Sequence, residues 1–137
     1  MIMAKDEGYI MDLCDRVLGQ VASRQHRFDF LRGDRGHRLP VDAYYANLKL
    51  AIEYHELQHL EPTPFWDNKP TASGMPRVEQ RGLYDQRRCE VLPRHGIALA
   101  ELCYLDFASD GRKRLLRVAE DDEQTVREKL SRWIDAR

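Results

Sequence analysis

The stretch Leu48-Lys49-Leu50-Ala51-Ile52-Glu53-Tyr54-His55, at positions 48 to 55, decides how the chain folds. As a strand, it is apolar on both faces and ends in the tripeptide Glu53-Tyr54-His55. As a helix, it belongs to one stripe of side chains that runs from Val41 to His59. Periodicity alone does not distinguish these interpretations in so short an apolar run. Because Asn47 lies between two apolar stretches and is typical of a hairpin turn, we expect a strand.

Periodicity and turn residues define the elements on either side of this stretch. Apolar residues spaced by three and four predict a helix from Tyr9 to Ala22. Strands are expected over residues 27–31, 39–45, 48–55 and 97–107, and helices from about residue 77 to Pro93 and from residue 120 onward. This order of helix, three strands, helix, strand and helix predicts an α/β fold, in which helices cover both faces of a small mixed sheet.

Length and composition restrict the class of protein. With 137 residues, 42% of them hydrophobic, the chain is long enough to bury one core, and we expect a single domain over residues 1–137. Its 22 basic and 23 acidic residues give a net charge of -1, which excludes a protein that coats DNA by bulk charge. No apolar run approaches the roughly 18 residues of a membrane span. Three cysteines without close-pair spacing are typical of a reduced, cytoplasmic protein.

Two carboxylates are expected to meet at one end of the predicted sheet. A hairpin that joins residues 39–45 to residues 48–55 brings Asp42 beside Glu53. Two such carboxylates form a hard-oxygen site of the kind that Mg²⁺ prefers, and an ion held there can promote phosphodiester hydrolysis. His55 follows Glu53 by two positions, so it projects from the same face of the strand and can act as a base or position water.

These residues resemble those of a known family. The segments that carry the resemblance are Pro40-Val41-Asp42, Glu53-Tyr54-His55, His59, Tyr84-Asp85-Gln86-Arg87-Arg88 and His95-Gly96-Ile97. In spacing they resemble the restriction-endonuclease-like (PD-(D/E)xK) nucleases, and most of all the branch of the very short patch repair mismatch endonuclease and its small relatives. The resemblance covers about residues 9 to 107.

The resemblance implies a DNA endonuclease of the nicking or repair type, with a restriction-endonuclease-like core and Mg²⁺ or Mn²⁺ as cofactor. The metal ligands that it implies are Asp42, Glu53, the carbonyl of Tyr54 and, through water, Asp15 of the first helix. The catalytic residues that it implies are Asp42, Glu53, His55 and His59. This chain departs from the family in having no lysine after Glu53 and in placing Glu56 where glycine is common. A non-catalytic DNA-binding relative is therefore an alternative.

A second motif shares the same residues. His55-Glu56-Leu57-Gln58-His59 satisfies H-E-x-x-H, in which two histidines one helical turn apart bind Zn²⁺ and the glutamate acts as a general base. A zinc metallopeptidase is thus the other alternative. It requires these residues to lie within a helix, whereas Pro62 and Pro64 follow almost at once. A strand at residues 48–55 favours the nuclease, and a helix there favours zinc.

Arginine dominates the basic residues on both sides of the predicted site. Its planar fork matches phosphate oxygens two at a time, which lysine cannot do. We therefore expect a partner that carries phosphates, which the resemblance implies is DNA, and we expect an aromatic side chain in the proline-rich loop at residues 61–76 to stack on bases. The expected nucleic-acid contacts are Arg77, Arg81, Arg87, Arg88 and Trp66. A homodimer would suit double-strand cleavage and a monomer would suit nicking; the sequence leaves both open.

Overall fold

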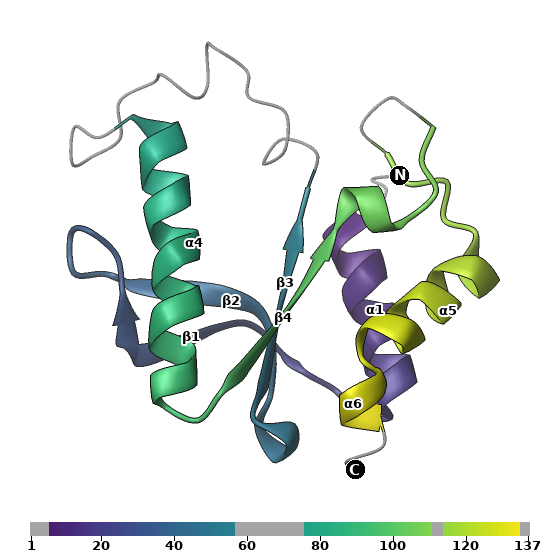
Figure 1. Ribbon diagram of the computed structural model, residues 1–137, viewed down its shortest axis with the longest axis horizontal. Helices are drawn as coiled ribbons and strands as arrows, with labels where there is room; N and C mark the ends of the chain where they lie inside the picture. Colours follow the sequence, from purple (N-terminus) through teal and green to yellow (C-terminus); the bar gives the residue numbers. More distant parts are fainter. Residues whose placement is uncertain (1–5, 57–75, 111–113, 135–137) are drawn as a thin grey trace.

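A computed structural model describes residues 6–56, 76–110 and 114–134 of the chain. The helices are α1 (Asp6–Leu18), α4 (Arg77–Arg94), α5 (Ala119–Lys129) and α6 (Ser131–Ile134). The strands are β1 (Ser23–Arg32), β2 (Arg38–Tyr45), β3 (Leu50–His55) and β4 (Ala98–Cys103), with 3₁₀ turns at Ala46–Leu48 and Tyr104–Asp106. The predicted order of helix, three strands, helix, strand and helix is confirmed (Figure 1).

The described strands form one mixed sheet in the order β1-β2-β3-β4. β1 pairs with β2 and β2 with β3 in antiparallel fashion, whereas β3 and β4 are parallel. A parallel pair needs a long crossover, and α4 lies in the connection from β3 to β4. The C-terminal end of β3 lies at the same end of the sheet as the N-terminal ends of α1 and α4 (Figure 1).

The stretch at residues 48–55 is a strand, as expected. β3 begins at Leu50, which pairs with Tyr45 of β2 and with Ala98 of β4. The hairpin turn is the 3₁₀ turn that contains Asn47, followed by Lys49 in the left-handed conformation at φ 50. The turn takes up two residues that we assigned to the strand, so β3 starts later than predicted.

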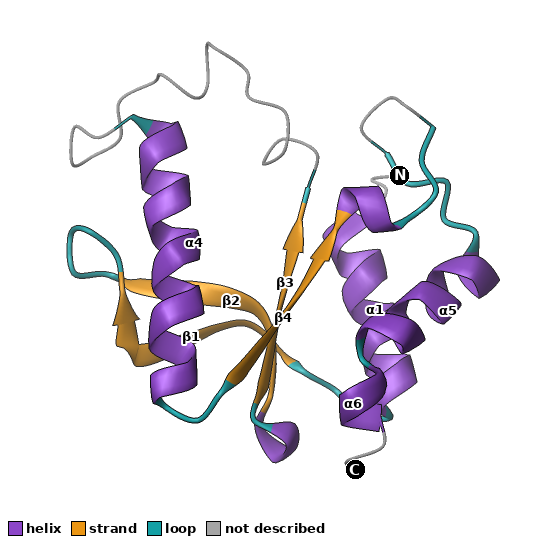
Figure 2. Cartoon of the chain, in the orientation of Figure 1, coloured by secondary structure: helices purple, strands orange, loops and turns teal. Residues whose placement is uncertain are grey.

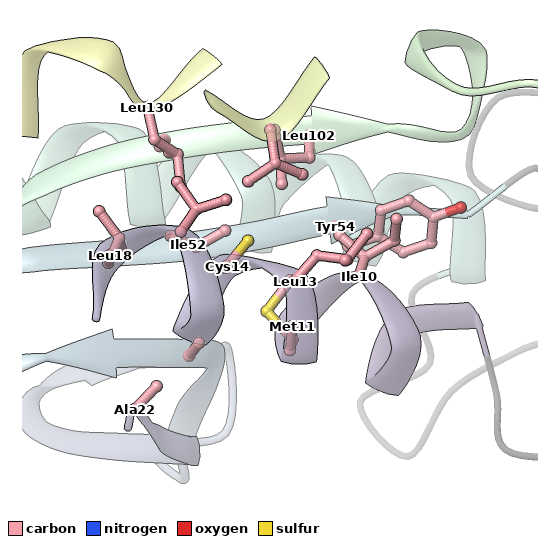
Figure 3. Packing of buried hydrophobic residues seen from close by; sticks show 14 of the residues in the cluster. Ile10, Met11, Leu13, Cys14, Leu18, Ala22, Ile52, Tyr54, Leu102 and Leu130 are labelled. Atoms are coloured by element: carbon pink, nitrogen blue, oxygen red, sulfur yellow. The ribbon is translucent and has the colours of Figure 1, made fainter. Parts of the chain in front are cut away.

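Helices cover both faces of the sheet, and each face has its own apolar core. One core lies between the sheet and the helices α1 and α5, and the other lies between the sheet and α4 (Figure 2). In the first core, Ile52 and Tyr54 of β3 and Leu102 of β4 lie among side chains of α1 (Figure 3). Because both faces are covered, a polar side chain in the middle of the sheet must find its partners within the protein.

Several predicted boundaries differ from the observed ones, and two of these differences lie at the C-terminal ends of elements and have a physical reason. The first helix ends at Leu18 rather than Ala22, because Gly19 takes a left-handed conformation at φ 67 that ends the helix. Val21, which fits the apolar spacing, is 89% exposed as a result. The last strand ends at Cys103, where the 3₁₀ turn Tyr104–Asp106 follows. In the described ranges, no helix is long and apolar enough to cross a membrane.

Candidate active site

The site begins where the pairing of β2 with β3 stops. The ladder runs from Tyr45 to Ala43, and the next position brings Asp42 beside Glu53. There the two carboxylates replace ladder hydrogen bonds. Asp42 Oδ2 accepts a hydrogen bond from the backbone N–H of Tyr54 at 2.7 Å, and the backbone N–H of Asp42 donates to Glu53 Oε2 at 3.4 Å. The predicted juxtaposition of Asp42 and Glu53 is thus present.

A third carboxylate, Glu7 in the first turn of α1, joins this pair through Gln25 of β1. The Gln25 side-chain amide donates to Glu7 Oε2 at 2.9 Å and to Asp42 Oδ1 at 3.3 Å. Gln25 lies between two residues that pair with β2 and adopts a positive φ of 49. For a residue other than glycine this backbone conformation is costly, and such conformations cluster at functional sites.

The three carboxylates open into a pocket of about 180 Å³. Its lining residues come from α1, β2, the end of β3 and α4: Glu7, Asp42, Glu53, Tyr54, His55, Glu56, Asp85 and Arg88. Five of the eight are carboxylates, and Arg88 is the only arginine or lysine among these described residues. The pocket is therefore strongly acidic even though the whole chain is nearly neutral.

Burial and the nearby negative charge disfavour the charged form of two of these carboxylates, Glu53 and Glu7. Burial and then the neighbouring Asp42 raise the pKa of Glu53 well above its ordinary 4.5, while Arg88 acts in the opposite direction. Burial and Asp42 also raise the pKa of Glu7, to about 7. Carboxyl groups whose pKa values are raised in this way release their protons when a cation binds beside them.

Arg88 of α4 supplies positive charge at the wall of the pocket. Its Nε lies 2.6 Å from Glu53 Oε1, and its Nη1 lies 3.2 Å from Asp85 Oδ1. The Nε–H donates to the carbonyl oxygen of Pro40 at 3.1 Å. Glu53 Oε1, which is buried, has no hydrogen-bond partner among the described residues, so its contact with Arg88 is an ion pair without a hydrogen bond.

His55 lines the same pocket at the end of β3. Its Nε2 lies 3.2 Å from Glu101 Oε1 of β4, and its side chain is 19% exposed. The parallel pairing of β3 with β4 sets this contact, because Glu53 pairs with Glu101 and His55 with Cys103. A carboxylate on one ring nitrogen fixes the orientation of an imidazole, which can then exchange a proton with a molecule in the pocket.

Most of the predicted site residues that the structure describes are brought together. Asp42, Glu53, Tyr54 and His55 all line the pocket. His59 and Trp66 lie outside the described residues. Of the predicted nucleic-acid contacts on α4, Arg88 lines the pocket. Arg81 follows Arg77 by four positions and precedes Arg88 by seven, so the three lie on the same side of the helix. Arg87 donates instead to the carbonyl of Arg32 at 2.6 Å.

The prediction that Asp15 approaches the metal site is not supported by its position. Asp15 Oδ1 accepts hydrogen bonds from the hydroxyl of Tyr45 at 2.5 Å and from the backbone N–H of Ala22 at 3.1 Å, and Oδ2 pairs with Arg24 at 2.8 Å. Asp15 is not among the described residues that line the pocket. Glu7 takes that place, because the N-terminal end of α1 faces the site.

Sequence reasoning missed Glu7 and Gln25. The signal for Glu7 was an acidic pair, Asp6-Glu7, ahead of an apolar periodic run, which is typical of a helix N-terminus. The predicted helix began at Tyr9, so Glu7 was left outside it. Gln25 had no such signal, since its role depends on a backbone conformation that glutamine seldom adopts.

The arrangement bears on both metal alternatives. Carboxylate oxygens suit Mg²⁺, and Glu7, Asp42 and Glu53 provide them. In the described ranges, however, no group of three or more His, Cys, Asp or Glu side chains is already arranged to hold a metal ion. The structure is less compatible with the zinc motif, because His55 lies in a strand and not in the helix that the motif requires.

Comparison with known proteins gives one distant relationship. No protein-family model matches the chain, and no solved structure matches it. The chain is similar to the uncharacterized protein 094L of Frog virus 3 (isolate Goorha), with 29% identity over 101 residues. The alignment covers 74% of this chain and 63% of the viral protein. The chain thus spans less than two thirds of the length of that relative.

Proposed function

We propose that this chain is a Mg²⁺- or Mn²⁺-dependent DNA endonuclease of the nicking or repair type. The observation that carries the proposal is the convergence of Glu7, Asp42 and Glu53 in one pocket where the β2–β3 ladder opens. These carboxylates come from three different elements. Burial and nearby negative charge disfavour the charged forms of Glu7 and Glu53, a cost that a role in binding a cation would explain.

The fold agrees with what the sequence resemblance implies. A helix, three antiparallel strands, a crossover helix and a strand parallel to β3 are the core expected of a restriction-endonuclease-like nuclease. In such a core the two motif carboxylates lie on neighbouring strands, as Asp42 and Glu53 do here. Fold alone does not define function, so the proposal rests on the acids and takes only support from the topology.

The donor chemistry of the pocket fits a hard divalent cation. Glu53 lines the pocket together with Asp42, and its buried Oε1 is an acceptor without a hydrogen bond among the described residues. Asp42, Glu53 and the carbonyl of Tyr54 would hold the ion, with Glu7 as a further acid. When bound, such an ion polarises the scissile phosphate and makes the attacking water more acidic.

The chain's own groups would prepare the rest of the reaction. His55, oriented by Glu101, is placed to accept a proton from water or to hold that water in line. Arg77, Arg81 and Arg88 share one side of α4, where their guanidinium groups would follow the phosphates of DNA. A monomer would nick one strand, and a homodimer would cut both. The three cysteines, none of which forms a disulfide, suit a reducing cytoplasm.

The direct test is cleavage by the purified chain. Supercoiled plasmid and labelled duplex, mismatched and single-stranded oligonucleotides are incubated with Mg²⁺ or Mn²⁺, and products are resolved on gels. We expect nicked or cut DNA from the wild type and none from Asp42→Ala. Asp29→Asn is a matched control, because Asp29 also lies on the sheet but is 84% exposed and pairs with Arg38.

Two results would contradict the proposal in different ways. A wild type that is inert on every substrate with both ions is not a nuclease. If it also binds DNA with a steep salt dependence, it is the non-catalytic DNA-binding relative. Cleavage that persists in Asp42→Ala would mean that the activity belongs to another site or to a contaminant.

A further inference from the structure

Arg88 lies against Glu53 Oε1, the acceptor that a divalent cation would need most. Its side chain is only 14% exposed, and its Nε lies 2.6 Å from the oxygen of Glu53 that has no hydrogen bond among the described residues. Glu53 itself is 7% exposed. Burial to this degree disfavours the ionised carboxylate, and the positive charge of Arg88 acts in the opposite direction by favouring it.

One arginine does not balance the acids around it. The pocket lining contains Glu7, Asp42, Glu53, Glu56 and Asp85 against Arg88. The pKa values of two of these acids, Glu7 and Glu53, are raised, first by burial and then by the neighbouring Asp42. The pocket therefore still favours a further positive charge, but the ion pair blocks part of the donor set.

Arg88 has two partners besides Glu53. Asp85, one helical turn earlier on α4, lies 3.2 Å from its Nη1, and the carbonyl of Pro40 accepts its Nε–H. The guanidinium thus keeps two partners if the contact with Glu53 is lost. An ion pair without a hydrogen bond is also easier to exchange than one in which each N–H is directed at an oxygen.

We infer that Arg88 is a built-in counterion that competes with a divalent cation for Glu53. While the pocket holds no ion, Arg88 pairs with Glu53; when an ion enters, Arg88 gives up Glu53 and stays on Asp85 and Pro40. The guanidinium group of Arg88 then lies at the pocket wall, where a phosphate oxygen can replace Glu53 as its partner. This inference rests on the proposed function for the choice of ion, but its test does not need cleavage.

The test measures Mn²⁺ binding by isothermal titration calorimetry at pH 8 in the absence of DNA. Arg88→Gln is expected to bind Mn²⁺ at least about fivefold more tightly than the wild type, because the competing cation is gone. The matched control is Arg94→Gln, which removes one positive charge from the same helix but from a residue that does not line the described pocket. It should bind Mn²⁺ within twofold of the wild type.

Two further variants keep the test decisive. Adding Asp42→Asn to Arg88→Gln should abolish the gain, which assigns the ion to this pocket. If Arg88→Gln fails to fold, Arg88→Lys serves in its place, since lysine keeps the charge but lacks the fork that reaches several partners at once; its affinity should lie between twofold and fivefold above the wild type.

The inference is overturned if a folded Arg88→Gln binds Mn²⁺ no more tightly than the wild type, or if Arg94→Gln gains as much. It is also overturned if the gain survives Asp42→Asn. A gain confined to Arg88→Gln in a protein that cuts no DNA would uphold the counterion and refute only the nuclease.

Discussion

The two ends of α1 carry acids in opposite situations. Asp15, near the C-terminal end, accepts two hydrogen bonds and pairs with Arg24. Glu7, in the first turn, is near Asp42 and has its pKa raised to about 7, first by burial and then by that neighbour. Each partner of Asp15 is a donor or a cation, whereas Glu7 accepts one hydrogen bond, from Gln25, and has the acids Asp42 and Glu56 as its charged neighbours. An acid that stabilises the fold is surrounded by donors, whereas an acid that remains next to like charges is, on the proposed function, one that awaits a cation.

The largest expected difference between the two ends is in catalysis. If the chain is the proposed nuclease, Glu7→Gln should lower the cleavage rate by roughly 10- to 100-fold, the range seen when a group around a metal site is lost. Asp15→Asn should leave the rate within twofold, measured well below its melting temperature. Single-turnover cleavage of a labelled duplex at saturating Mn²⁺ gives both values. Equal losses in the two variants would refute the division of roles along α1.

The next largest difference is in stability, with the order of the two ends reversed. Asp15→Ala leaves the hydroxyl of Tyr45, a residue only 1% exposed, without its acceptor and removes the acceptor of the Ala22 N–H. An unsatisfied buried donor costs about 1–3 kcal/mol, so we expect the free energy of unfolding to fall by about 2 kcal/mol. Urea unfolding followed by circular dichroism measures it. Tyr45→Phe in the same background should restore part of the loss, because the stranded hydroxyl is gone.

Stability should also depend on pH differently in Glu7→Gln. The folded-state pKa of Glu7 is about 7 and its ordinary value is 4.5, so between these values the folded chain binds more protons than the unfolded chain. The contribution of Glu7 to stability therefore falls as pH rises through this window. Glutamine does not titrate. In EDTA, Glu7→Gln should melt a few degrees above the wild type at pH 8, and the gap should close by pH 4. A gap that widens on acidification would contradict the raised pKa.

The same contrast explains which features the sequence predicts. The order of elements follows from local periodicity and turn residues, and the pairing of Asp42 with Glu53 follows from one hairpin. Both depend on residues near each other in the chain. The way in which α1 lies on the sheet depends on tertiary packing. The spacing of apolar residues along the helix does not show in which direction the helix runs across the sheet. Asp15 and Glu7 are both acids on α1, and only the direction in which the helix lies decides which of them meets Asp42.

Gln25 was missed for a different reason, because its role depends on a backbone conformation with a positive φ. Its substitution should give the smallest effect. Its positive φ carries a strain that glycine relieves and alanine does not, whereas both substitutions remove the hydrogen bonds to Glu7 and Asp42. Gln25→Gly should therefore be more stable than Gln25→Ala by about 1 kcal/mol in urea unfolding. Both should bind Mn²⁺ equally, since both lose the same link between the two acids. Equal stability would mean that no strain is stored at this position, and unequal Mn²⁺ binding would mean that the backbone, and not the amide, orders the acids.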